Sequence, residues 1–391
     1  MPNKVSHAAD LRGLSRLTIN AVTGVTELAE AVHLNILQQV PAPLARPLSR
    51  LTSYVYGGVR GATGLVGSGI ERALAKVQPL LGEQNGWTGR EALLAAVNGV
   101  LGDHLALSGN PLAITMGWRR HGQPLRPAAL DGASGRIVVL AHGLCMNDLQ
   151  WLRAGHDHGA MLERERGYTA VYLHYNSGRH ISQNGRALSQ QLQQLVDQWP
   201  VPVEELVIVG HSMGGLVARS ACHFGAQARH SWPARLSKLV CLGSPHQGAP
   251  LERGGNWFHV LTDLSSYTAP FSRLAKIRSA GITDLRHGSL LDEDWGGKDR
   301  FAHGAALPVA VPLPEGVACY ALAGTVGKTS GSRAGRLAGD GLVPLESALG
   351  RHDDPARQLD FAAERQAVVY RCNHMELLSS REVGEQLLAW L

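Results

Sequence analysis

The stretch Val207-Ile208-Val209-Gly210-His211-Ser212-Met213-Gly214-Gly215 decides the fold of this 391-residue chain. A β-branched apolar run leads directly into the pattern G-x-S-x-G, and helix-forming residues follow it at 216–219. A sharp turn between a strand and a helix presents its serine as a nucleophile, and glycines on either side let neighbouring backbone approach the turn. We therefore predict that Ser212 is a nucleophile and that Gly210, His211 and Gly214 shape its turn.

A second apolar run, Arg136–Ala141, ends in His142-Gly143-Leu144. Gly143 allows the backbone to turn where the strand ends, so that the next amide can face a developing oxyanion. The predicted oxyanion donors are the main-chain N–H groups of Leu144 and of Met213, the residue after the nucleophile. We expect His142 to shape this loop and not to act as a base.

A serine alone is a weak nucleophile, so the chain must also supply a base and an orienting acid. Asp340 lies between two glycines after a strand-like run and is the predicted acid, although an ordinary Asp-Gly turn is an alternative. Asp353 and Asp354 are its nearest rivals, in a more polar loop. His374 follows the last strand-like run by a short loop and is the predicted base, since ligand-side residues lie at the carboxyl ends of parallel strands.

Four segments together resemble the α/β-hydrolase superfamily, and in particular bacterial lipases and esterases and the PGAP1-like (GPI inositol-deacylase-like) α/β-hydrolases. They are the loop 142–144, the turn and helix 210–219, the stretch 242–250 and Gly-Asp-Gly-Leu-Val-Pro at 339–344. The resemblance extends from about residue 134 to the end of the chain. It implies an α/β-hydrolase fold and a Ser-Asp-His triad, and it makes His246 a loop residue near the site.

Strand-like runs alternate with helical segments after residue 130, which predicts an α/β fold with a mostly parallel, doubly wound sheet. The runs are 136–141, 169–174, 206–210, 238–243, 317–323 and 366–370, and the helical segments are 182–199, 215–228 and 381–391. The interval 246–312 mixes aromatic and charged residues without a clear central strand. It predicts a lid-like insertion. The alternative is a surface segment that packs on the domain and has no gating role.

Residues 1–130 predict a helical N-terminal module, which leaves 131–391 as the catalytic domain. Apolar residues recur at three- and four-residue spacings over 14–32 and 65–81, and Thr88-Gly89-Arg90-Glu91 is typical of a capping box ahead of a helix at 92–101. The module holds 12 Lys and Arg against 7 Asp and Glu, so the net charge of +5 lies within it. This mild excess argues against nucleic-acid binding and is compatible with weak association with a membrane or lipid surface.

The five cysteines are scattered and form no C-x-x-C pair, and the first residues contain no apolar leader, so we expect a cytoplasmic protein. Neither metal-ligand spacing nor a phosphate-binding glycine loop is visible, and we expect no metal and no cofactor. The predicted activity is hydrolysis of a lipid or other acyl ester through an acyl-enzyme. The alternatives are an acyltransferase, a polyester depolymerase, and a lipid-surface binding protein with a vestigial hydrolase core.

Overall fold

A computed structural model describes residues 4–5, 16, 53, 57, 84–85, 90–249, 279–297, 307–328 and 339–391. The chain divides into two compact units, residues 1–88 with 107–113 and residues 89–106 with 114–391. In the first unit, strands β1 (Lys4–Val5) and β2 (Gln84–Asn85) pair antiparallel. The helices predicted over 14–32 and 65–81 lie outside the described residues, and the helical nature of the N-terminal module stays a prediction.

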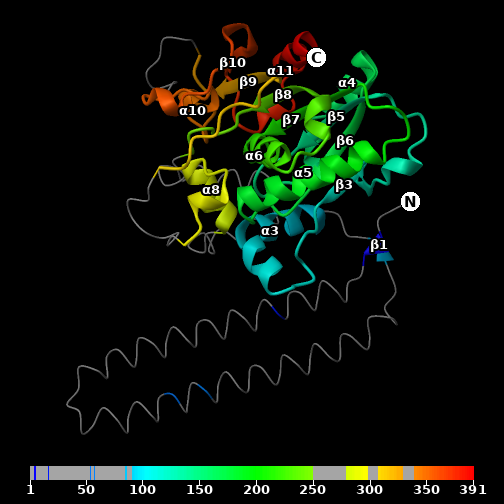
Figure 1. The fold of residues 1–391 in the computed structure, drawn as a ribbon, viewed down its shortest axis with the longest axis vertical. Helices are drawn as coiled ribbons and strands as arrows, with labels where there is room; N and C mark the ends of the chain where they lie inside the picture. Colours follow the sequence, from blue (N-terminus) through cyan, green and yellow to red (C-terminus); the bar gives the residue numbers. More distant parts are fainter. Residues whose placement is uncertain are drawn as a thin grey trace, which may run out of the picture. The chain divides into compact units, whose positions relative to one another are not determined.

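The second unit is built on an eight-stranded sheet in the order β10-β9-β8-β7-β5-β6-β3-β4 (Figure 1). The six strands from β10 to β6 pair in parallel, as the sequence predicts. They are β5 (Arg136–Ala141), β6 (Thr169–His174), β7 (Glu205–His211), β8 (Leu236–Leu242), β9 (Ala318–Thr325) and β10 (Gln366–Tyr370). Strand β7 lies near the centre, so the residue after it stands in the middle of the carboxyl edge.

Helices cover both faces of the sheet, which explains why its strands are almost continuously apolar. Helices α4 (His158–Arg166) and α11 (Arg381–Trp390) pack on one face, where their apolar residues join those of β5, β7, β8 and β9 in one core. Helices α5 (Ile181–Asp197) and α6 (Met213–Gln227) lie side by side, and α6 packs on β5, β7 and β8. This is the α/β-hydrolase architecture that the sequence predicts.

Two short strands extend the sheet where the sequence predicts only a helical module. Strand β3 (Gly117–Arg120) pairs antiparallel with β6, and β4 (Gln123–Pro124) pairs with β3 at the edge. Residues 114–130 therefore group with the sheet, and so does most of α3 (Arg90–Leu107), which contains the helix predicted at 92–101. Strands of two and four residues carry too few side chains to show an alternating pattern.

The structure describes residues 246–249, 279–297 and 307–312 of the predicted insertion. They include helix α8 (Ala280–His287) and a 3-10 turn at Asp292–Asp294. Helix α8 is fastened to the start of α5, because the Asp284 carboxylate accepts hydrogen bonds from the N–H of Ile181 at 2.8 Å and from the ring of His180 at 3.0 Å. A moving lid over 246–312 stays a prediction.

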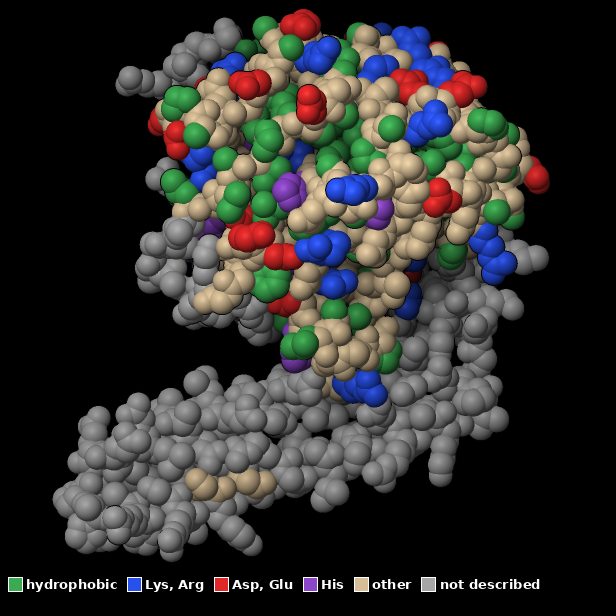
Figure 2. Space-filling view, in the orientation of Figure 1, with side chains coloured by type: hydrophobic (Ala, Val, Ile, Leu, Met, Phe, Trp, Pro, Cys, Tyr) green, Lys and Arg blue, Asp and Glu red, His purple; other side chains and the backbone are tan. Residues whose placement is uncertain are grey.

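The surface of the described residues carries both signs of charge. On the face shown in Figure 2, acidic and basic side chains are interspersed over the part of the molecule that is drawn in colour. None of the helices within the described residues is both long and apolar enough to cross a lipid bilayer.

Close packing of α5 on α6 gives a test of the fold at Gly185. A Cβ atom at this position would lie 2.2 Å from the Oγ of Ser220, whose hydroxyl is itself fixed because it donates to the carbonyl of Leu290 at 2.8 Å. Gly185→Ala in a helix interior should stabilise by about 1 kcal/mol on propensity alone. We expect the opposite sign here, a loss of about 1–3 kcal/mol from overpacking.

Urea unfolding followed by tryptophan fluorescence measures this effect, with Gln190→Ala on the exposed side of α5 as the matched control. The control should change the free energy of unfolding by less than about 0.5 kcal/mol. A more stable Gly185→Ala variant would show that the two helices are not packed in this way.

Candidate active site

Ser212 occupies a strained turn between β7 and α6. Its backbone has φ 54° and ψ −122°, a conformation that residues with a Cβ rarely adopt. Such strain costs on the order of 1–3 kcal/mol and persists only where the surrounding structure imposes it. The N–H of Ser212 donates to the carbonyl of Leu242 at the end of β8 at 2.9 Å, which fixes the turn against the neighbouring strand. The serine is 6% exposed.

The two glycines of the turn are required by close backbone approach. A Cβ atom on Gly210 would lie 2.4 Å from the nitrogen of Gly215, and one on Gly214 would lie 2.1 Å from the carbonyl oxygen of Ala141. Real Cβ contacts do not reach such distances, so a larger residue at either position would force α6 away from the sheet. The pattern G-x-S-x-G is thus set by the packing of a helix start onto two strands.

Asp340 and His374 form a buried pair. The Nδ1–H of His374 donates to Oδ2 of Asp340 at 2.7 Å, and the two residues are 4% and 2% exposed. The other carboxylate oxygen, Oδ1, accepts hydrogen bonds from the N–H groups of Leu342 and Val343 at 3.0 and 2.9 Å. Because each oxygen has its own donors, the carboxylate is held in one orientation, and a neutral imidazole that donates from Nδ1 presents Nε2 as an acceptor.

His374 lies next to the residue that precedes Ser212. The rings of His211 and His374 are 4.7 Å apart between centroids, and Nε2–H of His211 donates to the carbonyl of His374 at 3.0 Å. On the other side, a Cβ on Gly243 would lie 3.0 Å from Oδ2 of Asp340 and 3.4 Å from Cε1 of His374. The ends of β7 and β8 therefore enclose the Asp340–His374 pair.

The loop after β5 lies against Ser212. A Cβ added to Gly143 would be 3.0 Å from the Cβ of Ser212. Cys145, at φ 60°, donates its N–H to the hydroxyl of Ser177 at 3.0 Å, which holds the loop in its turn. Neither the N–H of Leu144 nor that of Met213, the first residue of α6, has an acceptor among the described residues.

Residues 132–310 match the model of the PGAP1-like alpha/beta domain. This confirms the resemblance that the sequence motifs predict. Comparison with curated protein sequences gives no match.

Two solved structures similar to this chain are those of a lipase and an esterase. The mature Bacillus licheniformis lipase BlEst2 is 17% identical, with a TM-score of 0.41 over 70% of this chain and 98% of that one. The Pyrococcus furiosus esterase Pf2001 is 14% identical, with a TM-score of 0.37 over 66% of this chain and 83% of that one. Values this low carry no information about a shared substrate.

Three other polar residues that the sequence singles out do not join the Asp340–His374 pair. His246 is buried against Arg219, and Asp353 and Asp354 are exposed, with the Asp354 carboxylate accepting from the N–H of Ala356. The described residues contain no cluster of His, Cys, Asp and Glu that could hold a metal ion.

Sequence reasoning missed the contacts that hold the loop after β5 and the loop that contains His374. The hydrogen bond from His211 to the backbone of His374 was not foreseen, and neither was Tyr175, whose hydroxyl donates to the carbonyl of His142 at 2.8 Å. The sequence showed His211 next to the nucleophile, but it did not show which backbone group its ring would meet.

His142 is neutral because it is buried. Its Nδ1–H donates to the carbonyl of Gly143 at 2.8 Å, and its ring stacks on Tyr175 with centroids 4.3 Å apart. Burial lowers the pKa of His142 to about 3 from 6.5, and burial likewise places the pKa of His211 well below its usual range. Both histidines are therefore uncharged at neutral pH.

The lowered pKa of His142 predicts a loss of stability in mild acid. Between pH 6.5 and about 3 the unfolded chain binds a proton at His142 that the folded chain does not, so stability falls as the pH decreases. One such proton changes the free energy of unfolding by about 1.4 kcal/mol per pH unit. We expect His142→Gln to remove that part of the slope.

The measurement is urea unfolding at several pH values across this window. His121→Asn is the matched control, because His121 is exposed and asparagine tolerates its positive φ of 51°. Equal slopes for wild type and His142→Gln would contradict a neutral, buried His142.

Proposed function

We propose that this protein is a serine hydrolase of carboxylic esters that acts through an acyl-enzyme, with Ser212 as nucleophile, His374 as base and Asp340 as orienting acid. The observation that carries the proposal is the buried 2.7 Å hydrogen bond between Asp340 and His374, beside the residue that precedes a strained serine. A carboxylate that fixes the tautomer of an imidazole is what a hydroxyl nucleophile needs for activation.

In the first half of the reaction, Nε2 of His374 takes the proton of Ser212 while Oγ forms a bond to the ester carbonyl carbon. The carbonyl π electrons move onto oxygen, and the Asp340 carboxylate stabilises the imidazolium that has formed. When the tetrahedral intermediate collapses, the bond to the alcohol oxygen breaks and His374 gives its proton to the departing alcohol. The acyl group remains on Ser212.

In the second half, His374 takes a proton from water as the water oxygen attacks the acyl-enzyme. Collapse of the second tetrahedral intermediate breaks the bond to Oγ, returns the proton to Ser212 and releases the carboxylic acid. In both halves the negatively charged oxygen is held by the N–H groups of Leu144 and Met213. Both groups lack an acceptor among the described residues, so they can bind the oxyanion without first breaking another hydrogen bond.

We expect Ser212→Ala to abolish ester hydrolysis, because alanine has no hydroxyl to form the acyl-enzyme. The measurement is turnover of p-nitrophenyl esters over a series of acyl chain lengths, whose optimum also distinguishes lipid from small soluble substrates. Competing alcohols in the same assay separate hydrolysis from acyl transfer.

Ser244→Ala is the matched control for the nucleophile. Ser244 is a buried serine whose Oγ forms no hydrogen bond of ordinary geometry within the described residues, so its loss should be close to neutral. Activity retained by a folded Ser212→Ala protein would contradict the proposal.

Asp340→Asn should reduce kcat by roughly 10⁴-fold, because an amide can no longer hold His374 in the required tautomer. The effect should appear in kcat with little change in the circular-dichroism spectrum. Asp353→Asn, at an exposed position, should leave the rate unchanged. Near-normal turnover by Asp340→Asn would assign the acid to another residue.

A further inference from the structure

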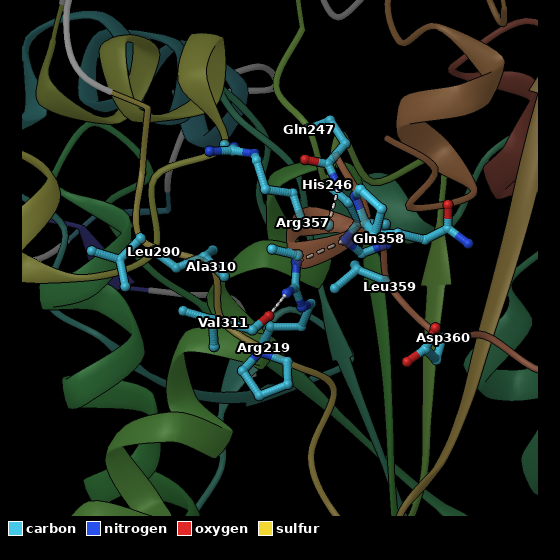
Figure 3. A pocket seen from close by; sticks show the side chains of 15 residues that line it. Arg219, His246, Gln247, Leu290, Ala310, Val311, Arg357, Gln358, Leu359 and Asp360 are labelled. Carbon is cyan, nitrogen blue, oxygen red and sulfur yellow. Dashed lines mark hydrogen bonds between the residues drawn. The ribbon is translucent and has the colours of Figure 1, made fainter. Parts of the chain in front are cut away.

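A cavity of about 250 Å³ lies beside α6 and is lined by residues that the proposed reaction does not use (Figure 3). Its walls come from α6, from the loop after β8, and from the segments 309–312 and 355–360. The volume is several times the roughly 30 Å³ that one water takes up in the liquid. The cavity therefore has room for a group of several heavy atoms.

Arg219 reaches this cavity as a buried cation without an acidic partner among the described residues. It is 3% exposed; one guanidinium nitrogen donates to Nδ1 of His246 at 3.2 Å and another donates to the carbonyl of Val311, as Figure 3 shows. Its Nε–H has no acceptor within the part of the chain that the structure describes. Burial lowers the pKa of Arg219 to about 10, so the group is still charged near neutral pH. A buried charge is costly unless an opposite charge or strong acceptors meet it.

His246 presents a second unpaired donor. Because its Nδ1 accepts the hydrogen bond from Arg219, the ring proton of the neutral imidazole lies on Nε2. Burial, together with the positive charge of Arg219, lowers the pKa of His246 well below its usual range and keeps the ring neutral. The residue is 4% exposed, and Nε2 has no acceptor within the described part of the chain.

Arg357 supplies the third donor from a loop that is firmly attached. Its Nη1 donates to the carbonyl of Pro308 at 3.0 Å, and its own carbonyl accepts from the side-chain amide of Gln247 at 2.7 Å. The Nε–H of Arg357 is buried and has no acceptor in the described structure. The one carboxylate of the lining, Asp360, is exposed, and Figure 3 shows it apart from the guanidinium of Arg219.

We propose that this cavity is a binding site for a phosphate-type oxyanion, held by Arg219, His246 and Arg357. Guanidinium groups match the geometry and charge of phosphate oxygens, and three unpaired donors from three segments suit a group with several peripheral oxygens. The anion offsets the buried charge of Arg219 and satisfies donors that are otherwise left without acceptors.

The location relates the site to the proposed chemistry. Arg219 follows Ser212 by seven residues, which is about two helical turns or roughly 10 Å along the same side of α6. A phosphate group carried by an ester substrate and free phosphate share this recognition chemistry. Only the first of these sources rests on the proposed ester hydrolysis.

Calorimetric titration of the full-length protein with sodium phosphate, against sodium chloride of matched ionic strength, tests the site without any enzyme assay. We expect saturable binding that weakens at least about tenfold in Arg357→Gln and in Arg219→Gln, the effect of losing one charge-assisted hydrogen bond. Arg351→Gln is the matched control, since Arg351 is exposed and, among the described residues, its guanidinium contacts the half-buried Glu346 and Gln366. Arg357→Gln keeps the test valid if Arg219→Gln does not fold.

Absence of saturable phosphate binding by the wild-type protein overturns the proposal, as does equal binding by wild type and a folded Arg357→Gln. The source of the phosphate is then decided by kcat/KM for a short-chain diacylglycerol phosphate and for the corresponding diacylglycerol. A selective loss on the phosphorylated ester in Arg357→Gln supports a substrate-borne phosphate. An unchanged ratio with lost calorimetric binding supports free phosphate at the same site.

Discussion

The crowding between the end of β7 and the start of α6 is the constraint on which the rest of the structure depends. Helix α6 begins so close to β5 and β7 that only glycine fits at positions 210 and 214. The chain between those glycines must turn within a few residues, and Ser212 takes a positive φ as a result. Packing of the apolar side of α6 on the sheet offsets this local strain, so the geometry of one residue is maintained by the folding of the whole domain.

The central sheet could be predicted because buried parallel strands are apolar over their whole length. The runs that end at Ala141 and His174 coincide with β5 and β6, and the run at 366–370 coincides with β10. Strands β3 and β4 could not be predicted in this way. They are short, they lie at an edge, and they contain charged residues such as Arg119, which forms ion pairs with Glu91 and Asp148.

The positions of Asp340 and His374 after parallel strands were visible in the sequence, because the carboxyl ends of such strands meet at one edge. The sequence could not show what each histidine contacts. His246 and His374 both follow strands within a few residues, yet one meets a guanidinium and the other a carboxylate. Arg219 was visible only as a helix-forming residue, since the absence of an acidic partner is a property of tertiary structure.

The hydrogen bonds between Asp340 and His374 affect how the loops between these two residues can change in length. Besides the side-chain bond, the N–H of His374 donates to the carbonyl of Asp340 at 3.0 Å, so two bonds close the chain between residues 34 apart. Closing a flexible loop costs only about 0.6 kcal/mol more when its length doubles. The loops of this closed segment can therefore gain or lose residues at little entropic cost. Sequences could diverge around 355–360 and remodel the neighbouring cavity while the acid and the base keep their mutual geometry.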